Sequence, residues 1–156
     1  MEKSNGMKPP VEVYIDGASL GNPGPAGVGI VFVDANRTPI AQLYKYLGET
    51  TNNVAEYLAL LYALQEAQRR GVTRLVVKTD SELLAKQLNG QYKVRDGTLR
   101  LFHDLALYAA QDFEQWSIEH VSRSHNTQAD RLANEAIESR FDTSLKNVIR
   151  SLRTEG

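Results

Sequence analysis

The chain has 156 residues, of which 42% are hydrophobic and 24% charged, with a formal net charge of −1. These values predict a single folded domain, and they exclude a disordered chain and a protein that holds nucleic acid through bulk positive charge. The chain has no cysteine and no apolar run long enough to span a membrane, so we expect a cytoplasmic protein whose metals, if any, are bound by oxygen or histidine.

The first third of the chain is predicted to form a lead-in and three strands. Residues 1–10 end in two prolines and are expected to be flexible. Residues 11–16 alternate with a two-residue period, which is typical of a strand, and the Gly- and Pro-rich residues 17–25 predict a turn. Further β-rich stretches at 27–33 and 40–47 complete a meander of three strands.

The remaining chain alternates helices with strands. Capping residues and terminal glycines delimit the helices, and short apolar centres mark the strands. In chain order we predict helix 55–70, strand 74–80, helix 81–89, helix 98–110, strand 116–121 and helix 127–140. The order βββαβααβα predicts an α/β domain with a mixed sheet over residues 11–140, followed by a tail at 141–156.

Two acidic residues stand at the ends of apolar strands. Asp16 closes the first strand and Asp80 the fourth. If these strands are parallel neighbours, both side chains emerge at the carboxyl edge of the sheet, where open α/β sheets hold their ligands. Taken singly, each aspartate is better explained as a residue that starts a turn or caps a helix.

Two more acids stand in the first turns of helices. Glu56 could form a capping box with Asn53, and Asp130 is favoured there by the helix dipole. Together with Asp16 and Asp80, however, they form a set of oxygen donors that would repel one another without a cation. Four such ligands suit a pair of Mg²⁺ ions.

Four segments of the chain resemble the motifs of the ribonuclease HI family, in order and at matching spacing. They are distributed across residues 11–137. The segments are Tyr14-Ile15-Asp16-Gly17-Ala18-Ser19-Leu20-Gly21-Asn22-Pro23-Gly24-Pro25-Ala26-Gly27, Thr51-Asn52-Asn53-Val54-Ala55-Glu56-Tyr57, Thr79-Asp80-Ser81 and Asn126-Thr127-Gln128-Ala129-Asp130-Arg131-Leu132-Ala133.

The resemblance implies a ribonuclease H-like fold, with a five-stranded sheet flanked by helices. It also implies hydrolysis of the RNA strand of RNA–DNA hybrids by two metal ions, which leaves a 5′-phosphate and a 3′-hydroxyl. Asp16, Glu56, Asp80 and Asp130 would be the ligands of two Mg²⁺ or Mn²⁺ ions, in keeping with the chemistry of paired metals.

The same resemblance implies contacts between the hybrid and six further residues. Glycine at position 17 would let the backbone approach the RNA closely. For the three asparagines, a turn or cap role is about as well supported by local sequence. The implied substrate contacts are Gly17, Asn22, Thr51, Asn52, Asn53 and Glu82.

The chain departs from many bacterial members of the family in the loop at 89–98. It is too short for their basic protrusion, so the chain resembles the shorter archaeal-like branch. Lys93, Arg95 and Arg100 could replace part of that protrusion, although a solvated charged loop explains them equally well. Because some members of this branch also cut double-stranded RNA, that is a second candidate substrate.

A compact segment precedes the last aspartate, where longer members have a glycine- and histidine-containing loop. His125 could titrate near neutral pH and move a proton, whereas Arg123 could bind the scissile phosphate as a fixed cation. We favour Arg123.

The sequence therefore predicts a monomeric endoribonuclease that acts on hybrids and not at membranes. One alternative is a non-catalytic module that binds hybrids, although such modules normally lose an acid. Another is a different nuclease of the same fold, such as a junction resolvase, which should lack the asparagine-containing segments at 21–24 and 51–53.

Overall fold

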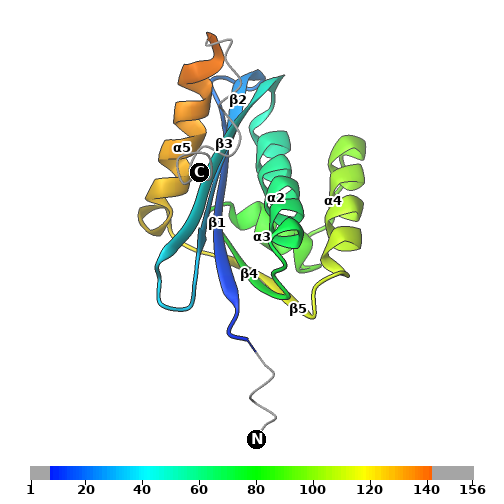
Figure 1. Ribbon diagram of the computed structural model, residues 1–156. Coiled ribbons are helices and arrows are strands. Elements are labelled where there is room, and N and C mark those ends of the chain that lie inside the picture. Colours follow the sequence, from blue (N-terminus) through cyan, green and yellow to red (C-terminus); the bar gives the residue numbers. More distant parts are fainter. Residues whose placement is uncertain (1–7, 142–156) are drawn as a thin grey trace, which may run out of the picture.

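The computed structural model describes residues 8–141, which form a five-stranded sheet with helices on both faces (Figure 1). The strand order is β3-β2-β1-β4-β5. β1 pairs antiparallel with β2 and parallel with β4, which confirms the predicted mixed sheet. The strands are β1 (Val11–Ser19), β2 (Gly24–Val33), β3 (Pro39–Thr50), β4 (Arg74–Thr79) and β5 (Gln115–His120).

The helices are divided unequally between the two faces (Figure 1). One face is covered by α2 (Asn52–Arg69), α3 (Glu82–Leu88) and α4 (Gly97–Ala110), and the other by α5 (Thr127–Glu138). The main core lies on the first face, and a smaller cluster lies beneath α5. Representative core residues are Val13, Ile15, Phe32, Leu60 and Val77, and those beneath α5 are Val31, Tyr44, Ala129, Leu132 and Ala136.

Helix α5 lies unusually close to β2 because two strand positions lack side chains. A Cβ atom at Gly29 would collide with the carbonyl oxygen of Ala129, and one at Gly27 would lie 2.8 Å from the carbonyl oxygen of Ala133. Glycine at these positions therefore lets the helix backbone rest directly on the sheet.

The first strand is longer than the sequence predicts. β1 continues past Asp16 to Ser19, because Gly17 to Ser19 pair with Val28 to Ala26 of β2. The expectation that Asp16 ends the strand is therefore wrong, and the turn expected at 17–25 is shorter, with only residues 20–23 between β1 and β2. Gly17, Gly24 and Pro25 suggested a turn from their residue types, although all three lie in paired strands.

The two chain ends fall outside the described range. The expected lead-in at 1–10 and tail at 141–156 lie outside it except for residues 8–10 and 141. Phe141 ends a short 3-10 turn, Ser139–Phe141, that follows α5. No helix between residues 8 and 141 is long and apolar enough to cross a membrane.

Candidate metal centre

The parallel pairing of β1 and β4 brings Asp16 and Asp80 to one edge of the sheet. The last paired residues are Ile15 and Thr79, and each aspartate directly follows one of them. The prediction that these two acids meet at one edge, where two neighbouring parallel strands stop pairing, is thus confirmed. β4 ends at this point, whereas Asp16 stays paired with Gly29 on its other side.

Glu56 reaches the same edge from helix α2. Its Oε1 atom accepts a hydrogen bond from the Gly17 N–H at 3.2 Å, so the side chain points towards β1. The helix is capped by Thr51, whose hydroxyl accepts from the Val54 N–H at 3.2 Å. The alternative of a capping box between Asn53 and Glu56 is therefore wrong.

Asp16, Glu56 and Asp80 form a tight carboxylate cluster. A carboxylate oxygen of each lies within 4.8 Å of the other two. Asp16 and Glu56 are only 5% and 6% exposed. Within residues 8–141, no other three acidic or histidine side chains approach one another as closely.

Burial and mutual repulsion make this cluster hard to ionise. Burial, followed by the charges of Glu56, Asp80 and Asp130, raises the pKa of Asp16 to about 9. Burial and the charge of Asp80 raise the pKa of Glu56 to about 8, although the Gly17 N–H and the charge of Arg123 oppose this. A bound cation would counteract both shifts, because it stabilises the ionised carboxylates.

Asp130 stands beside this cluster, in the first turn of α5. Its charge raises the pKa of Asp16, as does a hydrogen bond that the protonated Asp16 carboxyl donates to it, so the two carboxyl groups are neighbours. The Asn134 amide donates to the Asp130 side chain at 3.4 Å. All four predicted acids therefore gather in one region, with Asp130 outside the tightest group.

The donor set fits hard divalent cations. It consists of carboxylate oxygens alone, which Mg²⁺ and Mn²⁺ prefer. In the described part of the chain, none of the four acids forms an ion pair with a lysine, arginine or histidine. The negative charge gathered here thus has no partner of opposite sign in direct contact.

Arg123 and His125 lie in η1 (Arg123–His125), the 3-10 turn that joins β5 to α5. Both are exposed. The charge of Arg123 lowers the pKa of Glu56, so its field reaches the cluster. His125 is held through Nδ1, which lies 2.8 Å from the Ser122 hydroxyl. Their part in a reaction stays a prediction.

Four of the predicted substrate-binding residues gather where the β1–β2 turn meets the start of α2. The Asn22 side-chain oxygen accepts from the Asn52 N–H at 2.9 Å, which ties the turn to the helix. Asn22, Asn52 and Asn53 are exposed, and Thr51 is half-buried. These side chains form a polar rim next to Glu56.

The other two predicted contacts have intramolecular roles. A Cβ atom at Gly17 would collide with the carbonyl oxygen of Ala55, so glycine is needed here for the approach of β1 to α2. Glu82 is exposed and forms an ion pair with Lys86 at 3.0 Å. Backbone access to RNA at Gly17 remains a prediction.

Sequence reasoning assigned no role to Asn126, although the residue stands in the fourth motif. It is 1% exposed, and its amide donates to the carbonyl oxygen of Ile15 at 2.8 Å. Before a helix, an asparagine suggests a cap, yet this side chain makes no capping hydrogen bond to α5. The contact spans 111 residues, so no local pattern could have revealed it.

Comparison with known proteins agrees with this architecture. A family model described as reverse transcriptase-like matches residues 14–136. Ribonuclease HI of Halobacterium salinarum is 44% identical over 128 residues, which are 82% of this chain and 64% of that protein. The chain thus spans less than two thirds of that relative, and 36% of three mycobacterial relatives that are 40% identical.

Solved structures match over nearly their whole length. The crystal structure of RNase H1 from the same Halobacterium superimposes with a TM-score of 0.82 at 43% identity, covering 84% of this chain and 99% of that one. LC11-RNase H1, solved in complex with an RNA/DNA hybrid, gives a TM-score of 0.81 at 37% identity, covering 85% and 99%.

Proposed function

The chain belongs to the ribonuclease HI family, and from that premise we propose that it is a metal-dependent endoribonuclease that cuts the RNA strand of RNA–DNA hybrids. The observation that carries this proposal is the cluster of Asp16, Glu56 and Asp80, drawn from three separate segments to within 4.8 Å of one another. A relative of the same fold has been solved with such a hybrid bound, which supports this substrate class.

Asp16, Glu56, Asp80 and Asp130 would hold two Mg²⁺ or Mn²⁺ ions. When bound, such ions supply an activated water and stabilise the leaving oxygen of an in-line displacement, which leaves a 5′-phosphate and a 3′-hydroxyl. The protein's own contribution is to hold the carboxylates in place before binding. Strand pairing holds Asp16, and the Gly17 N–H holds Glu56.

Two side chains of the η1 turn would assist the reaction. Arg123 carries a fixed positive charge whose influence reaches Glu56, so it can bind the scissile phosphate. His125, oriented by Ser122, can take up or deliver a proton in the reaction. We assign the larger effect to Arg123, because a permanent charge acts on the phosphate throughout the reaction.

The hybrid would lie across the polar rim at Asn22 and Thr51 to Asn53, with Glu82 and the Gly17 backbone as further contacts. Choice of RNA requires hydrogen bonds to the 2′-hydroxyl, which side-chain amides can both give and accept. The exposed loop with Lys93 and Arg95, and Arg100 on α4, would contact phosphates on the same duplex.

We further propose that residues 11–140 form the catalytic domain, and that it acts as a monomer in the cytoplasm. Double-stranded RNA is a secondary substrate in this proposal, because its minor groove also presents 2′-hydroxyl groups.

The test offers the full chain four labelled substrates: RNA–DNA hybrid, double-stranded RNA, single-stranded RNA and duplex DNA. Each is incubated with Mg²⁺, with Mn²⁺ or with EDTA. We expect cleavage of the hybrid's RNA strand with either metal, none with EDTA, and slower cleavage of double-stranded RNA. Products should carry a 5′-phosphate, which a 5′-phosphate-dependent exonuclease would detect.

Three outcomes would overturn the proposal. Cleavage in EDTA would rule out the metal chemistry. Equal cutting of duplex DNA, or preference for four-way DNA junctions, would indicate another nuclease of this fold. Tight binding of the hybrid without turnover in either metal would indicate a non-catalytic binding module.

A further inference from the structure

Asn126 connects the two segments that carry Asp16 and Asp130. Its amide nitrogen donates to the carbonyl oxygen of Ile15, the residue before Asp16, at 2.8 Å. Its own backbone carbonyl accepts from the Asp130 N–H at 3.1 Å, within the first turn of α5. One buried residue therefore touches the backbone next to one acid and the backbone of the other.

The bond to Ile15 is made where β1 and β4 stop pairing with each other. Pairing of β1 with β4 stops at Ile15 and Thr79, and β4 ends there. Past this point β1 is paired on the β2 side alone among the described strands. The side chain of Asn126 thus supplies a donor to β1 at the last residue that β4 supports.

The environment of Asn126 is costly for a residue that serves stability alone. Its side-chain oxygen is buried and has no hydrogen-bond partner within residues 8–141. Leaving a buried polar atom unpaired costs at least as much stability as one hydrogen bond contributes. The amide bond to Ile15 consequently adds little net stability, and a positional role explains the residue better.

We propose that Asn126 is a positioning residue that holds Asp16 and Asp130 at the separation needed for both to bind the same pair of metal ions. The inference rests on the proposed function in taking these acids as metal ligands. Asn126 itself is almost fully buried, so it acts through the two carboxylates and not through the substrate.

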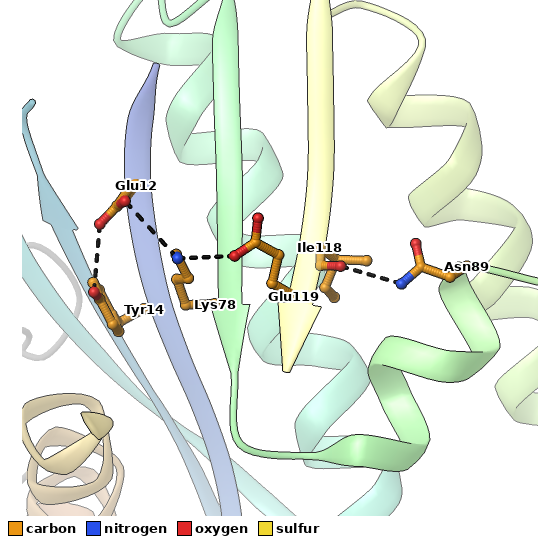
Figure 2. Close-up of polar contacts among 6 residues, drawn as sticks. All are labelled: Glu12, Tyr14, Lys78, Asn89, Ile118 and Glu119. Atoms are coloured by element: carbon orange, nitrogen blue, oxygen red, sulfur yellow. Dashed lines mark hydrogen bonds and ion pairs between the residues drawn. The ribbon is translucent and has the colours of Figure 1, made fainter. Parts of the chain in front are cut away.

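The chain offers a matched control in Asn89. Its amide also donates to a strand carbonyl, that of Ile118 in β5, at 3.2 Å (Figure 2). β5 carries none of the four acids. Asn89→Ala therefore removes the same kind of bond without touching the carboxylate cluster.

The experiment measures Mn²⁺ binding by calorimetry on the full-length wild-type chain and on Asn126→Ala and Asn89→Ala, without substrate. We expect Asn126→Ala to weaken Mn²⁺ binding by about 10- to 100-fold, the usual effect of losing a group that orients metal ligands. Asn89→Ala should bind Mn²⁺ as the wild type does. Unchanged Mn²⁺ affinity in folded Asn126→Ala, or an equal loss in both variants, would overturn the proposal.

Asn126→Asp provides a second variant of nearly the same volume in case the alanine variant folds poorly. It cannot donate to Ile15 when ionised, yet it adds negative charge near the site. Charge alone would tighten Mn²⁺ binding, whereas loss of the positioning bond weakens it. We expect weaker binding, and tighter binding would contradict the inference.

Kinetics on the hybrid separate this role from substrate contact. Asn126→Ala should lower kcat at saturating metal and leave KM for the hybrid unchanged, because a buried side chain makes no contact with the duplex. A raised KM with normal kcat would assign the residue to substrate binding instead. If the wild type fails to cleave hybrid, the proposed activity fails, whereas the Mn²⁺ titrations still decide the positioning role.

Discussion

Two clusters of charged side chains lie along strands β1 and β4, one around Glu12 and Lys78 and the other around Asp16 and Asp80, the residue that follows β4. In the first, the Lys78 ammonium lies 2.9 Å from Glu119 and 3.9 Å from Glu12 (Figure 2). The hydrogen bond to Glu119 raises the pKa of Lys78, so the ammonium is held in its charged form. This cluster contains both signs of charge and is partly exposed.

The second cluster lies four residues further along β1 and just past the end of β4, yet it contains acids only. Asp16 and Glu56 are buried, and their pKa values are raised to about 9 and about 8. The first cluster contains its own cation, whereas the second would bind a cation from solution once its acids ionise. Four predictions test this difference, from the largest expected effect to the smallest.

Removing a carboxylate from the cluster around Asp16 and Asp80 should have the largest effect, a loss of turnover. We expect Asp16→Asn and Asp80→Asn each to lower turnover by at least about 10²-fold, because the shape remains while a metal-binding charge is lost. Rates on labelled hybrid in Mg²⁺ measure this effect. Lys78→Gln, which disrupts the cluster around Glu12 and Lys78, is the control and should leave turnover unaltered. Near-normal activity in either aspartate variant would contradict the assignment.

The positive charge of Arg123 acts on the cluster, because it opposes part of the rise in the pKa of Glu56. We expect Arg123→Ala to reduce kcat by roughly 10- to 100-fold, since it removes the fixed charge that we propose binds the scissile phosphate. His125→Ala should reduce it by less than about threefold, because a solvent-exposed proton carrier can be replaced in part by water. A collapse of activity in His125→Ala alone would reverse this ranking.

The metal-free protein should lose stability as the pH rises. The pKa of Asp16 is about 9 in the folded chain against 3.8 as the reference, so the folded state binds more protons than the unfolded state between these values. The free energy of unfolding should therefore fall between about pH 5 and pH 9. Thermal denaturation in EDTA across this range measures it.

Added Mn²⁺ should reverse this loss at pH 8, since the ion binds only the folded cluster. Asp16→Asn should show a flatter pH profile and, without metal, a higher melting temperature than the wild type at pH 8. A wild-type profile that rises with pH in EDTA would exclude unrelieved repulsion among these acids.

Disrupting the cluster around Glu12 and Lys78 should have the smallest effect, and on stability alone. Lys78→Gln removes ion pairs to Glu119 and Glu12 whose side chains are 52% and 29% exposed. Such pairs contribute up to about 1 kcal/mol, so we expect a small loss in the free energy of unfolding that shrinks in high salt. Urea denaturation at low and high NaCl measures it, and a loss of several kcal/mol would show that the pairs matter more.

The sequence reveals those parts of this site that depend on local order. Asp16 and Asp80 could be placed at one edge on the condition that the two apolar strands before them are parallel neighbours, and the pairing of Ile15 with Thr79 confirms that condition. Four family-like motifs gave the fold and identified Glu56 and Asp130, for which capping was the better local explanation.

What the sequence missed depends on contacts between distant segments. Thr51, and not Asn53, caps α2, because the choice among three adjacent polar residues depends on where the chain enters the helix. The glycine at 17 is required by the backbone of α2, and Asn126 is directed to a strand 111 residues earlier. Neither partner can be inferred from neighbouring residues.

The close packing of α5 on β2 has a consequence for the fourth acid. Gly29 is the antiparallel partner of Asp16, and a methyl group there would press on the carbonyl of Ala129, one residue before Asp130. The height of Asp130 above the sheet thus depends on a position in β2, a strand that carries none of the four acids. A methyl group at position 29 would force α5 or β2 to shift, so the placement of one proposed metal ligand depends on a residue without a side chain.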